Sequence, residues 1–310
     1  MKKALGIAIV LLAVLAAVYL AGSWYFSSMI VKFQTKSLDE QRAEIGTPAD
    51  FGLPTPEEVT IPADDMTLAG WYFDNPADGD CGVILLHGHT GTRYGVLEYA
   101  PLFWPKGCDL LLYDHRFHGA STGNYGTYGY YEKGDALAAL AWFAQRTGLQ
   151  PGQIGLLGES YGAATVLQAA PSAPDLAFVA ADSPYEDLPT IISEQGVQRF
   201  GGWTRLFIPG ALALSGLRAS FAPSQVSALL AAPQIDAPVF LSHSATDEYT
   251  LPHHSQDIAA QLPATLCQRL HLTDWGSEHA ASVGDDFAAY QAQLEEFLAA
   301  CAPEFGQETP

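Results

Sequence analysis

The pentapeptide Gly158-Glu159-Ser160-Tyr161-Gly162 constrains the fold of this chain more than any other stretch. It follows an apolar run, Ile154–Leu157, and leads into an alanine-rich segment that begins at Ala163. This order predicts a strand, a sharp turn and a helix, with the serine hydroxyl lifted above the end of a sheet. The two flanking glycines are needed because the strand and the helix pass close to each other at such a turn.

Apolar runs alternate with helical patterns along much of the chain, which predicts βαβ units and a mostly parallel sheet. The alternation breaks over residues 187–232, where an apolar stretch interrupted by Gly-Gly and Pro-Gly predicts a helical cap insertion. We therefore expect residues 57–302 to form one α/β domain, followed by a tail over residues 303–310. Strands are expected at Glu57–Ile61, Thr67–Phe73, Gly82–His87, Cys108–Tyr113, Ile154–Leu157, Leu176–Ala181, Val239–His243 and Leu266–Leu272, and helices at Tyr131–Arg146, Ala163–Ala170, Leu251–Leu262 and Asp285–Ala300.

The N-terminal segment is apolar enough to cross a membrane. Residues 4–31 carry no charge, and as a helix they would reach roughly 42 Å, more than the ~30 Å hydrocarbon core of a bilayer. Trp24, Tyr25 and Phe26 resemble the aromatic groups found at membrane interfaces. We expect residues 1–31 to form a single transmembrane anchor. The alternative is a signal peptide that is cleaved near Ala21-Gly22-Ser23.

The orientation of this anchor rests on a nearly balanced count of positive charges. Lys2 and Lys3 precede the apolar segment, and Lys32, Lys36 and Arg42 follow it. A short tail with two lysines usually stays in the cytoplasm, which favours an extracytoplasmic catalytic domain. Residues 32–56 carry the charges and prolines expected of a linker.

An excess of acidic residues limits the partners of this chain. It has 34 acidic and 14 basic residues and a formal net charge of −20. Because a nucleic-acid partner requires a basic face, the charge argues against one. Only 15% of the residues are charged, so the chain is expected to be a soluble, self-repelling globule rather than a disordered acidic polymer.

The cysteines show no metal-binding spacing and no Cys-x-x-Cys pair. We expect four free buried thiols, because free cysteine is among the most buried residue types. The alternative pairs Cys81 with Cys108 and Cys267 with Cys301, which is one of three possible connectivities. No metal and no cofactor is expected.

Two downstream residues supply what a serine nucleophile lacks. A hydroxyl needs a neighbouring imidazole to accept its proton, and the imidazole needs an orienting carboxylate. Asp247 follows the strand Val239–His243, and His279 follows the strand Leu266–Leu272. Both therefore lie at the carboxyl edge of the sheet, where Ser160 also emerges. We expect Ser160 to be the nucleophile, Asp247 the acid and His279 the base.

Other residues compete for these roles. Glu248 lies one residue out of register with Asp247. His253 and His254 are expected on the surface of a helix, and His115 and His118 in a structural turn.

The reaction also needs hydrogen-bond donors for the oxyanion that forms in the transition state. The amide of Tyr161, at the start of a helix, is one candidate. The second is the amide of His89, in the glycine-containing loop after the strand Gly82–His87. Two interpretations of the His89 imidazole stay open: it lines the pocket, or it faces solvent.

Several motifs together resemble a known family. They identify the chain as a member of the α/β-hydrolase superfamily, and it resembles in particular the Bem46/ABHD13-like membrane-anchored serine hydrolases. The resemblance covers roughly residues 57–300, and implies a mostly parallel sheet flanked by helices with Ser160, Asp247 and His279 as the triad. Phe117 and Ser244 stand where this family usually has glycine. The matching stretches are Leu86-His87-Gly88, Tyr113–Ser121, Gly158–Gly162, Asp182-Ser183-Pro184-Tyr185, Asp247 and His279.

These features favour hydrolysis of a carboxylic ester or thioester through an acyl-enzyme. The membrane tether and the apolar cap favour a small-molecule or lipid-like acyl substrate. A serine peptidase of the prolyl-oligopeptidase type is the runner-up, because Gly-Glu-Ser-Tyr-Gly also resembles that hydrolase domain. A membrane-tethered binding protein on a hydrolase scaffold is a third possibility, although such proteins usually lose a triad member.

Overall fold

A single mixed sheet organises the molecule. The computed structural model describes residues 2–64, 66–77 and 79–306. Within these residues eight strands follow the order β1-β2-β4-β3-β5-β6-β7-β8. The pairs β1–β2 and β2–β4 are antiparallel and the other neighbours are parallel. The strands are β1 (Glu57–Ala63), β2 (Met66–Phe73), β3 (Gly82–Leu86), β4 (Asp109–Tyr113), β5 (Ile154–Glu159), β6 (Phe178–Asp182), β7 (Val239–Ser244) and β8 (Gln268–Thr273).

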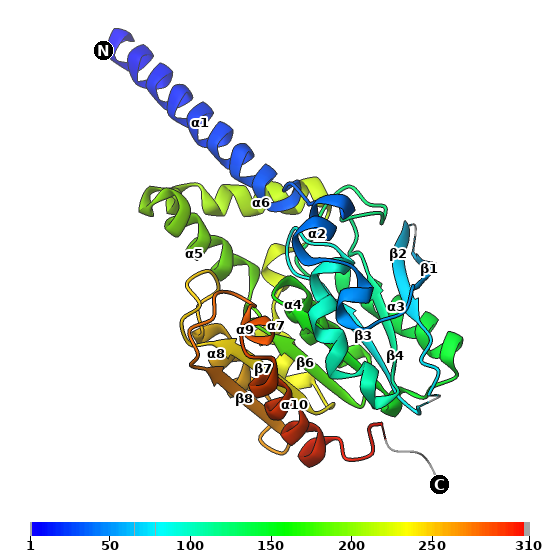
Figure 1. Cartoon of the computed structure of the whole chain (residues 1–310). Coiled ribbons are helices and arrows are strands. Elements are labelled where there is room, and N and C mark those ends of the chain that lie inside the picture. The colour runs from blue at the N-terminus through cyan, green and yellow to red at the C-terminus, as the bar shows by residue number, and fades with distance from the viewer. Residues whose placement is uncertain (1, 65, 78, 307–310) are drawn as a thin grey trace.

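Helices cover both faces of this sheet, as Figure 1 shows. The predicted α/β-hydrolase fold is therefore confirmed. The helices are α1 (Lys2–Val31), α2 (Leu38–Ile45), α3 (Glu132–Thr147), α4 (Tyr161–Ala169), α5 (Leu188–Phe200), α6 (Ile208–Ala219), α7 (Ala228–Ala231), α8 (His253–Gln261), α9 (Ser282–Asp285) and α10 (Phe287–Cys301), and a long 3-10 segment, η2, spans Arg93–Leu102.

The side chains on the two faces of β3 pack into two separate apolar clusters. Ile84 and Leu86 pack into the cluster that contains residues of α3 and α4, such as Phe143. Val83 and Leu85 pack into the cluster that contains η2 and α10. Every residue of β3 is buried, as expected for a parallel strand that is covered on both faces.

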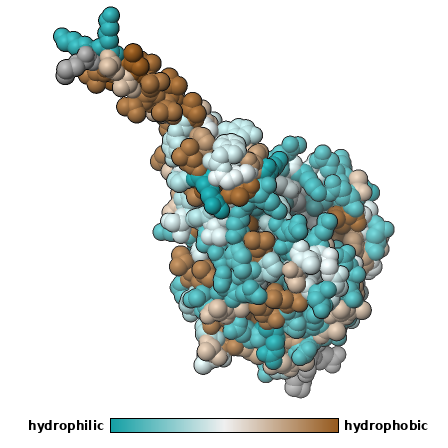
Figure 2. Space-filling model, turned by 90° about the vertical axis from the view of Figure 1, so that its left-hand side faces the viewer, coloured by the Kyte–Doolittle hydropathy of each residue, from teal (hydrophilic) through white to brown (hydrophobic). Residues whose placement is uncertain are grey.

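The helix α1 divides into an exposed part and a packed part. It is long and apolar enough to cross a membrane by length and composition, which suits an anchor or a signal sequence. It projects from the domain in Figure 1, with α6 lying across its base. Its buried residues, Ser23, Ser27, Ile30 and Val31, all lie near its C-terminal end. Figure 2 shows hydrophobic side chains along the projecting part and hydrophilic ones at its tip.

The segment expected to be a linker is ordered and packed against the domain. A capping box of Ser37 and Glu40 starts α2. Backbone hydrogen bonds run from Gly126 N to Val31 O and from Lys36 N to Thr90 O. Phe33 is buried. Charges and prolines predicted a linker, and these long-range contacts fix the path of that segment against the domain.

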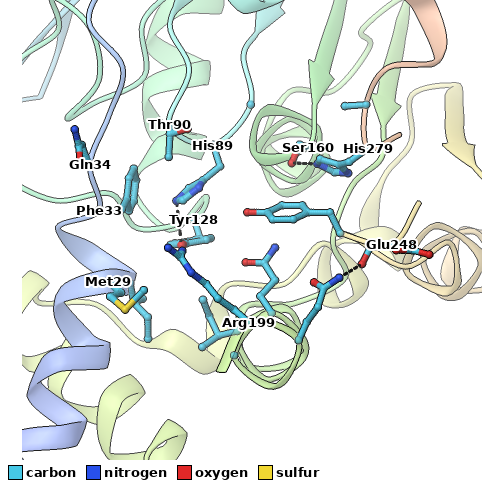
Figure 3. A pocket seen from close by; sticks show the side chains of 18 of the residues that line it. Met29, Phe33, Gln34, His89, Thr90, Tyr128, Ser160, Arg199, Glu248 and His279 are labelled. Atoms are coloured by element: carbon cyan, nitrogen blue, oxygen red, sulfur yellow. Dashed lines mark hydrogen bonds between the residues drawn. The ribbon is translucent and has the colours of Figure 1, made fainter. Parts of the chain in front are cut away.

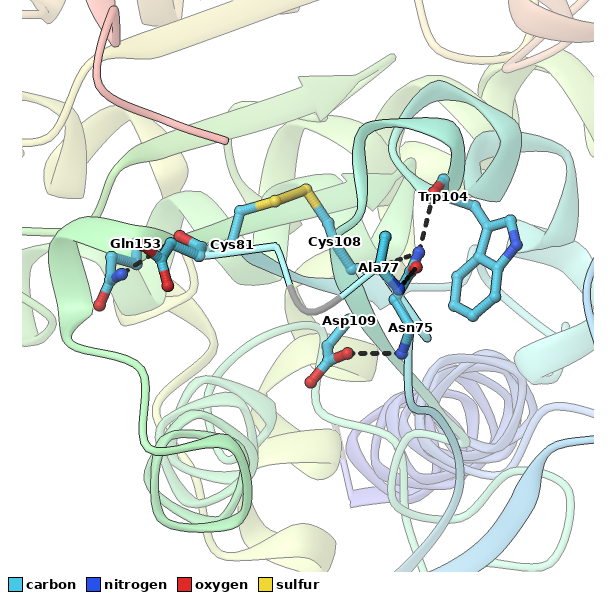
Figure 4. Close-up of a disulfide and its surroundings, with 8 residues drawn as sticks. Asn75, Ala77, Cys81, Trp104, Cys108, Asp109 and Gln153 are labelled. Carbon is cyan, nitrogen blue, oxygen red and sulfur yellow. Dashed lines mark hydrogen bonds between the residues drawn. A yellow bond between two sulfur atoms is a disulfide. The ribbon is translucent and has the colours of Figure 1, made fainter. Parts of the chain in front are cut away.

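Both cysteine pairs are disulfides, so the expectation of four free thiols is wrong. Cys81 and Cys108 directly precede the paired residues Gly82 and Asp109 of the neighbouring strands β3 and β4. Figure 4 shows this disulfide beside Asn75 and Asp109. The backbone N–H of Asn75 donates a hydrogen bond of 2.7 Å to Asp109 Oδ1. The second disulfide, Cys267–Cys301, ties the start of β8 to the end of α10.

Candidate active site

Ser160 sits in a strained turn between β5 and α4. Its φ is 48° and its ψ is −106°, a conformation that costs a non-glycine residue about 1–3 kcal/mol. Its amide donates to Asp182 O at 2.7 Å, which holds the turn against β6. A Cβ on Gly158 would lie 2.2 Å from the backbone of Gly162, and one on Gly162 would lie 2.1 Å from Leu86 O. Only glycine fits at these two positions.

The structure brings Ser160, His279 and Asp247 into one line of hydrogen bonds. His279 Nε2 lies 2.7 Å from Ser160 Oγ, and His279 Nδ1 lies 2.6 Å from Asp247 Oδ2. Figure 3 shows His279 pointing directly at Ser160. An imidazole held in this way has its Nδ1–H directed to the carboxylate, which leaves Nε2 free to accept the serine proton.

Asp247 is held as a buried carboxylate by four donors. The amides of Tyr249 and Thr250 donate to Oδ1 at 2.8 and 2.9 Å. His243 Nε2 lies 3.2 Å from Oδ2, beside the bond from His279. Burial alone would raise the pKa of Asp247, but the hydrogen bonds from His243 and His279 outweigh it and hold that pKa well below its usual range.

Ser244 occupies the position where the resembling family has glycine, and it connects two loops. Its hydroxyl donates to Ser277 O at 2.6 Å, and Thr246 Oγ1 donates to the same carbonyl at 3.0 Å. Ser277 lies two residues before His279. The departure from glycine therefore ties the loop of Asp247 to the loop of His279.

The amides of His89 and Tyr161, expected from the sequence to stabilise an oxyanion, belong to residues that are half-buried and buried, respectively, in the structure. In the described part of the chain, neither His89 N nor Tyr161 N donates a hydrogen bond. Buried amides are otherwise almost always paired, so these two are available to a bound ligand.

The His89 imidazole lines the cavity. This settles which of the two interpretations left open by the sequence is correct, namely that the ring lines the pocket. Its Nε2 lies 3.2 Å from the Tyr128 hydroxyl, and its ring centroid lies 4.1 Å from that of Phe33. Burial, and then the nearby His279, lower the pKa of His89 to about 4. The ring is therefore neutral at physiological pH.

Within the described residues, those that competed for the acid and base roles make no hydrogen bond to Ser160 or His279. The backbone carbonyl of Glu248 accepts a hydrogen bond from Gln198 at 2.7 Å, and its carboxylate makes no bond to His279 within the described residues. His254 is fully buried, so its expected surface position is wrong. It is buried because Glu194 of α5 covers it and accepts from its Nε2 at 2.9 Å.

One group of described residues has side chains close enough to share a metal ion. The ligand atoms of Glu186, His253 and His254 all lie within 4.8 Å of one another. Glu194 also accepts from the Nε2 atoms of both histidines, at 3.0 and 2.9 Å. None of these four side chains lines the cavity at Ser160, so the group is separate from the serine site.

A cavity of about 1360 Å³ leads away from Ser160 and His279. It exceeds the roughly 300–1,000 Å³ of most small-molecule sites. One end is acidic. Burial, and then Asp182 and Asp285, raise the pKa of Glu98 there to about 7, and burial raises the pKa of Glu159 well above its usual range.

Several residues that line this cavity were not predicted from the sequence. They include Phe33 and Met29 from the N-terminal segment, Tyr128 from the loop before α3, and Arg199 from α5. Of the four tyrosines in residues 125–131, Tyr128 lines the cavity. No local pattern marked the N-terminal residues, because their role depends on where α1 packs.

Comparisons with known proteins agree with this fold. The family model described as X-Pro dipeptidyl-peptidase (S15 family) matches residues 17–220. The chain is 32% identical over 242 residues to the uncharacterized protein YqkD of Bacillus subtilis (strain 168), which covers 73% of this chain and 74% of that protein. The finer resemblance to Bem46/ABHD13-like proteins stays a prediction.

Two solved structures are similar in fold alone. The esterase Pf2001 of Pyrococcus furiosus superposes with a TM-score of 0.67 at 24% identity, covering 83% of this chain and 96% of the esterase. The acylaminoacyl peptidase of Pyrococcus horikoshii superposes with a TM-score of 0.63 at 17% identity, covering 83% of this chain and 43% of the peptidase.

Proposed function

The chain belongs to the X-Pro dipeptidyl-peptidase (S15) family of α/β-hydrolases, and from this premise we propose that it is a serine hydrolase of carboxylic esters or thioesters. One observation carries the proposal. The hydroxyl of Ser160, in a strained turn, is joined through His279 to the buried carboxylate of Asp247 by bonds of 2.7 and 2.6 Å. A nucleophile, a base and an orienting acid are the parts that acyl transfer requires.

In the proposed reaction, Ser160 Oγ attacks the acyl carbon while His279 Nε2 takes the hydroxyl proton. His279 then gives this proton to the oxygen or sulfur of the leaving group, and the bond from the acyl carbon to that atom breaks. Water attacks the acyl-enzyme by the same steps and regenerates Ser160. Asp247 stays ionised and stabilises the imidazolium.

The amides of His89 and Tyr161 are proposed to stabilise the oxyanion. Their support is that both lack a partner within the described residues and that His89 lines the cavity. Removing one such donor typically costs about 10²–10³ in rate.

A peptidase or aminoacyl hydrolase is the second candidate. The description of the matched family and the acylaminoacyl peptidase fold favour it. The discriminating measurement is the ratio of kcat/KM for an ester and an amide with the same acyl group. A higher value for the amide would reverse the ranking.

We propose that residues 1–31 anchor the protein in a membrane and that the domain over residues 57–302, with its cap at about 187–232, lies outside the cytoplasm. The length and apolar character of α1 support the anchor. The two disulfides support the location, because disulfides persist in oxidising compartments.

The test is a panel of p-nitrophenyl esters of increasing acyl length, assayed with the wild type and Ser160→Ala. We expect Ser160→Ala to abolish turnover and labelling by a fluorophosphonate probe. Ser224→Ala changes an exposed serine in the cap and should leave both unchanged. Ester turnover that survives in Ser160→Ala would contradict the mechanism, and failure of the probe to label the wild type would favour a binding protein.

A further inference from the structure

The N-terminal helix forms a wall of the cavity that holds Ser160. Tyr25, Phe26, Met29 and Ile30 of α1 line the same cavity as Ser160 and His279. Figure 3 shows Met29 and Phe33 on one side of this space, with Ser160 and His279 on another. The cavity is therefore bounded at one end by the reacting hydroxyl and at the other by the helix that is apolar enough to enter a bilayer.

This wall is rigidly built. Gly22 and Gly210 bring α1 and α6 into close contact, since a Cβ on Gly22 would lie 2.4 Å from the Phe207 ring and one on Gly210 would lie 2.3 Å from Ser23 Oγ. Deeper in the same contact, Ser215 Oγ donates to Ser27 Oγ at 3.1 Å. The contact explains why polar serines are buried in an otherwise apolar helix.

The surface around the base of α1 has the character of a membrane interface. Trp24 and Tyr25 of α1 are exposed, and so are Trp203, Leu206 and Leu217 of the cap. Arg218 lies over the Trp24 ring at 4.2 Å. Exposed tryptophan and tyrosine beside cations are typical of the headgroup region of a bilayer.

Positive charge also gathers at this end of a strongly acidic chain. Lys32 and Arg199 line the α1 end of the cavity, and Arg205 and Arg218 belong to the cap beside it. Among the described residues Arg199 forms no ion pair with a carboxylate; its guanidinium lies over the Phe200 ring. Within its described residues, a chain with a net charge of −20 thus gathers cations that are not paired with carboxylates near the base of α1, where lipid phosphates would lie.

We propose that the substrate is an ester lipid resident in the bilayer, whose ester group reaches Ser160 through the cavity between α1 and the cap without crossing open water, while its acyl chain lies against α1 and α5. This inference rests on the proposed function and names its substrate class. Lys32 and Arg199 contact the headgroup oxygens, and the aromatic side chains of α1 and α5 contact the acyl chain. The size of the cavity is explained by the need to hold a chain and part of a headgroup.

The test uses the full chain in phosphatidylcholine vesicles and two esters. One is a fluorogenic long-chain ester lipid embedded in the vesicle, and the other is water-soluble p-nitrophenyl acetate. Met29→Trp narrows the wall at α1 without contacting Ser160. We expect it to lower the ratio of kcat/KM for the embedded ester to kcat/KM for the acetate by at least about tenfold. Leu20→Trp adds the same side chain on the exposed part of α1 and should leave this ratio unchanged.

Equal loss on both esters, or no loss on the embedded ester, would overturn entry along α1. If the wild type turns over neither ester and is not labelled by fluorophosphonate, the proposed function fails first. Turnover of the acetate alone would leave the serine mechanism intact and overturn the lipid substrate.

A second measurement does not depend on how Met29→Trp folds. The full-length Ser160→Ala variant is irradiated in vesicles that contain phosphatidylcholine with a photoreactive group near the end of one acyl chain. We expect cross-links to Met29, Ile192 or Phe200, which line the cavity. Cross-links confined to residues 4–22 would overturn the proposal.

Discussion

Glu98 allows the electrostatics of the cavity to be tested by a single substitution. Its side chain lies at the acidic end of the cavity and accepts no hydrogen bond from any residue in the described ranges. Burial, followed by the charges of Asp182 and Asp285, raises its pKa from 4.5 to about 7. The folded protein therefore prefers the protonated acid, and the substitution Glu98→Gln replaces that acid by a neutral group of the same shape.

The magnitude follows from this difference in pKa. Between 4.5 and about 7 there are about 2.5 pH units, which at 1.36 kcal/mol each correspond to roughly 3 kcal/mol. Glu98 lines a cavity that water can enter, so screening reduces the figure to about 1–3 kcal/mol. Because the folded-state pKa is raised, the stabilisation by the proton is complete below pH 4.5 and is lost as the pH rises through about 7.

The assay is the melting temperature of the full chain in detergent at pH 4.5 and at pH 8. At pH 8 we expect Glu98→Gln to melt about 2–12 °C above the wild type, at 2–4 °C per kcal/mol, and at pH 4.5 the two should nearly coincide. Glu296→Gln, on the exposed face of α10, is the matched control and should show no such pH-dependent difference. A gain that is equal at both pH values, or a lower melting temperature at pH 8, would refute the reasoning.

Three further substitutions test the parts of the site, and a fourth, in α3, is a control. Asp247→Asn should lower kcat for p-nitrophenyl acetate by about 10⁴, because the amide favours the wrong imidazole tautomer; a loss below tenfold would remove Asp247 from its role. Ser244→Ala removes the 2.6 Å hydrogen bond to Ser277 O. It should lower the free energy of unfolding by about 1 kcal/mol and lower kcat several-fold. An unchanged kcat would show that the loops of Asp247 and His279 are positioned independently. Gly162→Ala should yield no folded protein, since its Cβ would lie 2.1 Å from Leu86 O. In the control Gly134→Ala, in α3, the added Cβ meets nothing within 4 Å, so this variant should stabilise the fold by up to about 1 kcal/mol. Circular dichroism and thermal melting distinguish the two outcomes.

Local sequence patterns predicted what is decided locally. The turn at Ser160 depends on two glycines and the residues next to them, and the buried strands are short apolar runs of the kind that predicts a parallel sheet. The loops of Asp247 and His279 were located because both follow strands, and parallel strands place their carboxyl ends at one edge. This placement predicted that the three residues lie near one another, whereas their side-chain bonds also depend on contacts between the loops, such as those of Ser244 and Thr246 with Ser277 O.

Features that depend on distant contacts could not be predicted in the same way. The position of β3 between β4 and β5 is a property of the whole sheet, and the disulfide Cys81–Cys108 follows from that order. His254 looked exposed because a helical pattern says nothing about α5 lying above it. Phe33 lies in the segment that was predicted to be a linker. Its burial could not be predicted locally, because it comes from contacts with His89 and Phe117, which lie far along the chain.

The link between α1 and the site does not depend on how the N-terminus is processed. Every buried residue of α1 lies at Ser23 or later, whereas a signal peptidase would cut near Ala21-Gly22-Ser23. The residues of α1 that line the cavity begin at Tyr25, so the wall remains in a cleaved protein as well as in an anchored one. Backbone bonds from Gly126 to Val31 and from Lys36 to Thr90 then fix the segment that follows the wall against the loop of His89. From Ser23 onward the N-terminal segment is therefore packed into the domain, and the contact with the cap extends back to Gly22 and Tyr19, which both lie against Phe207.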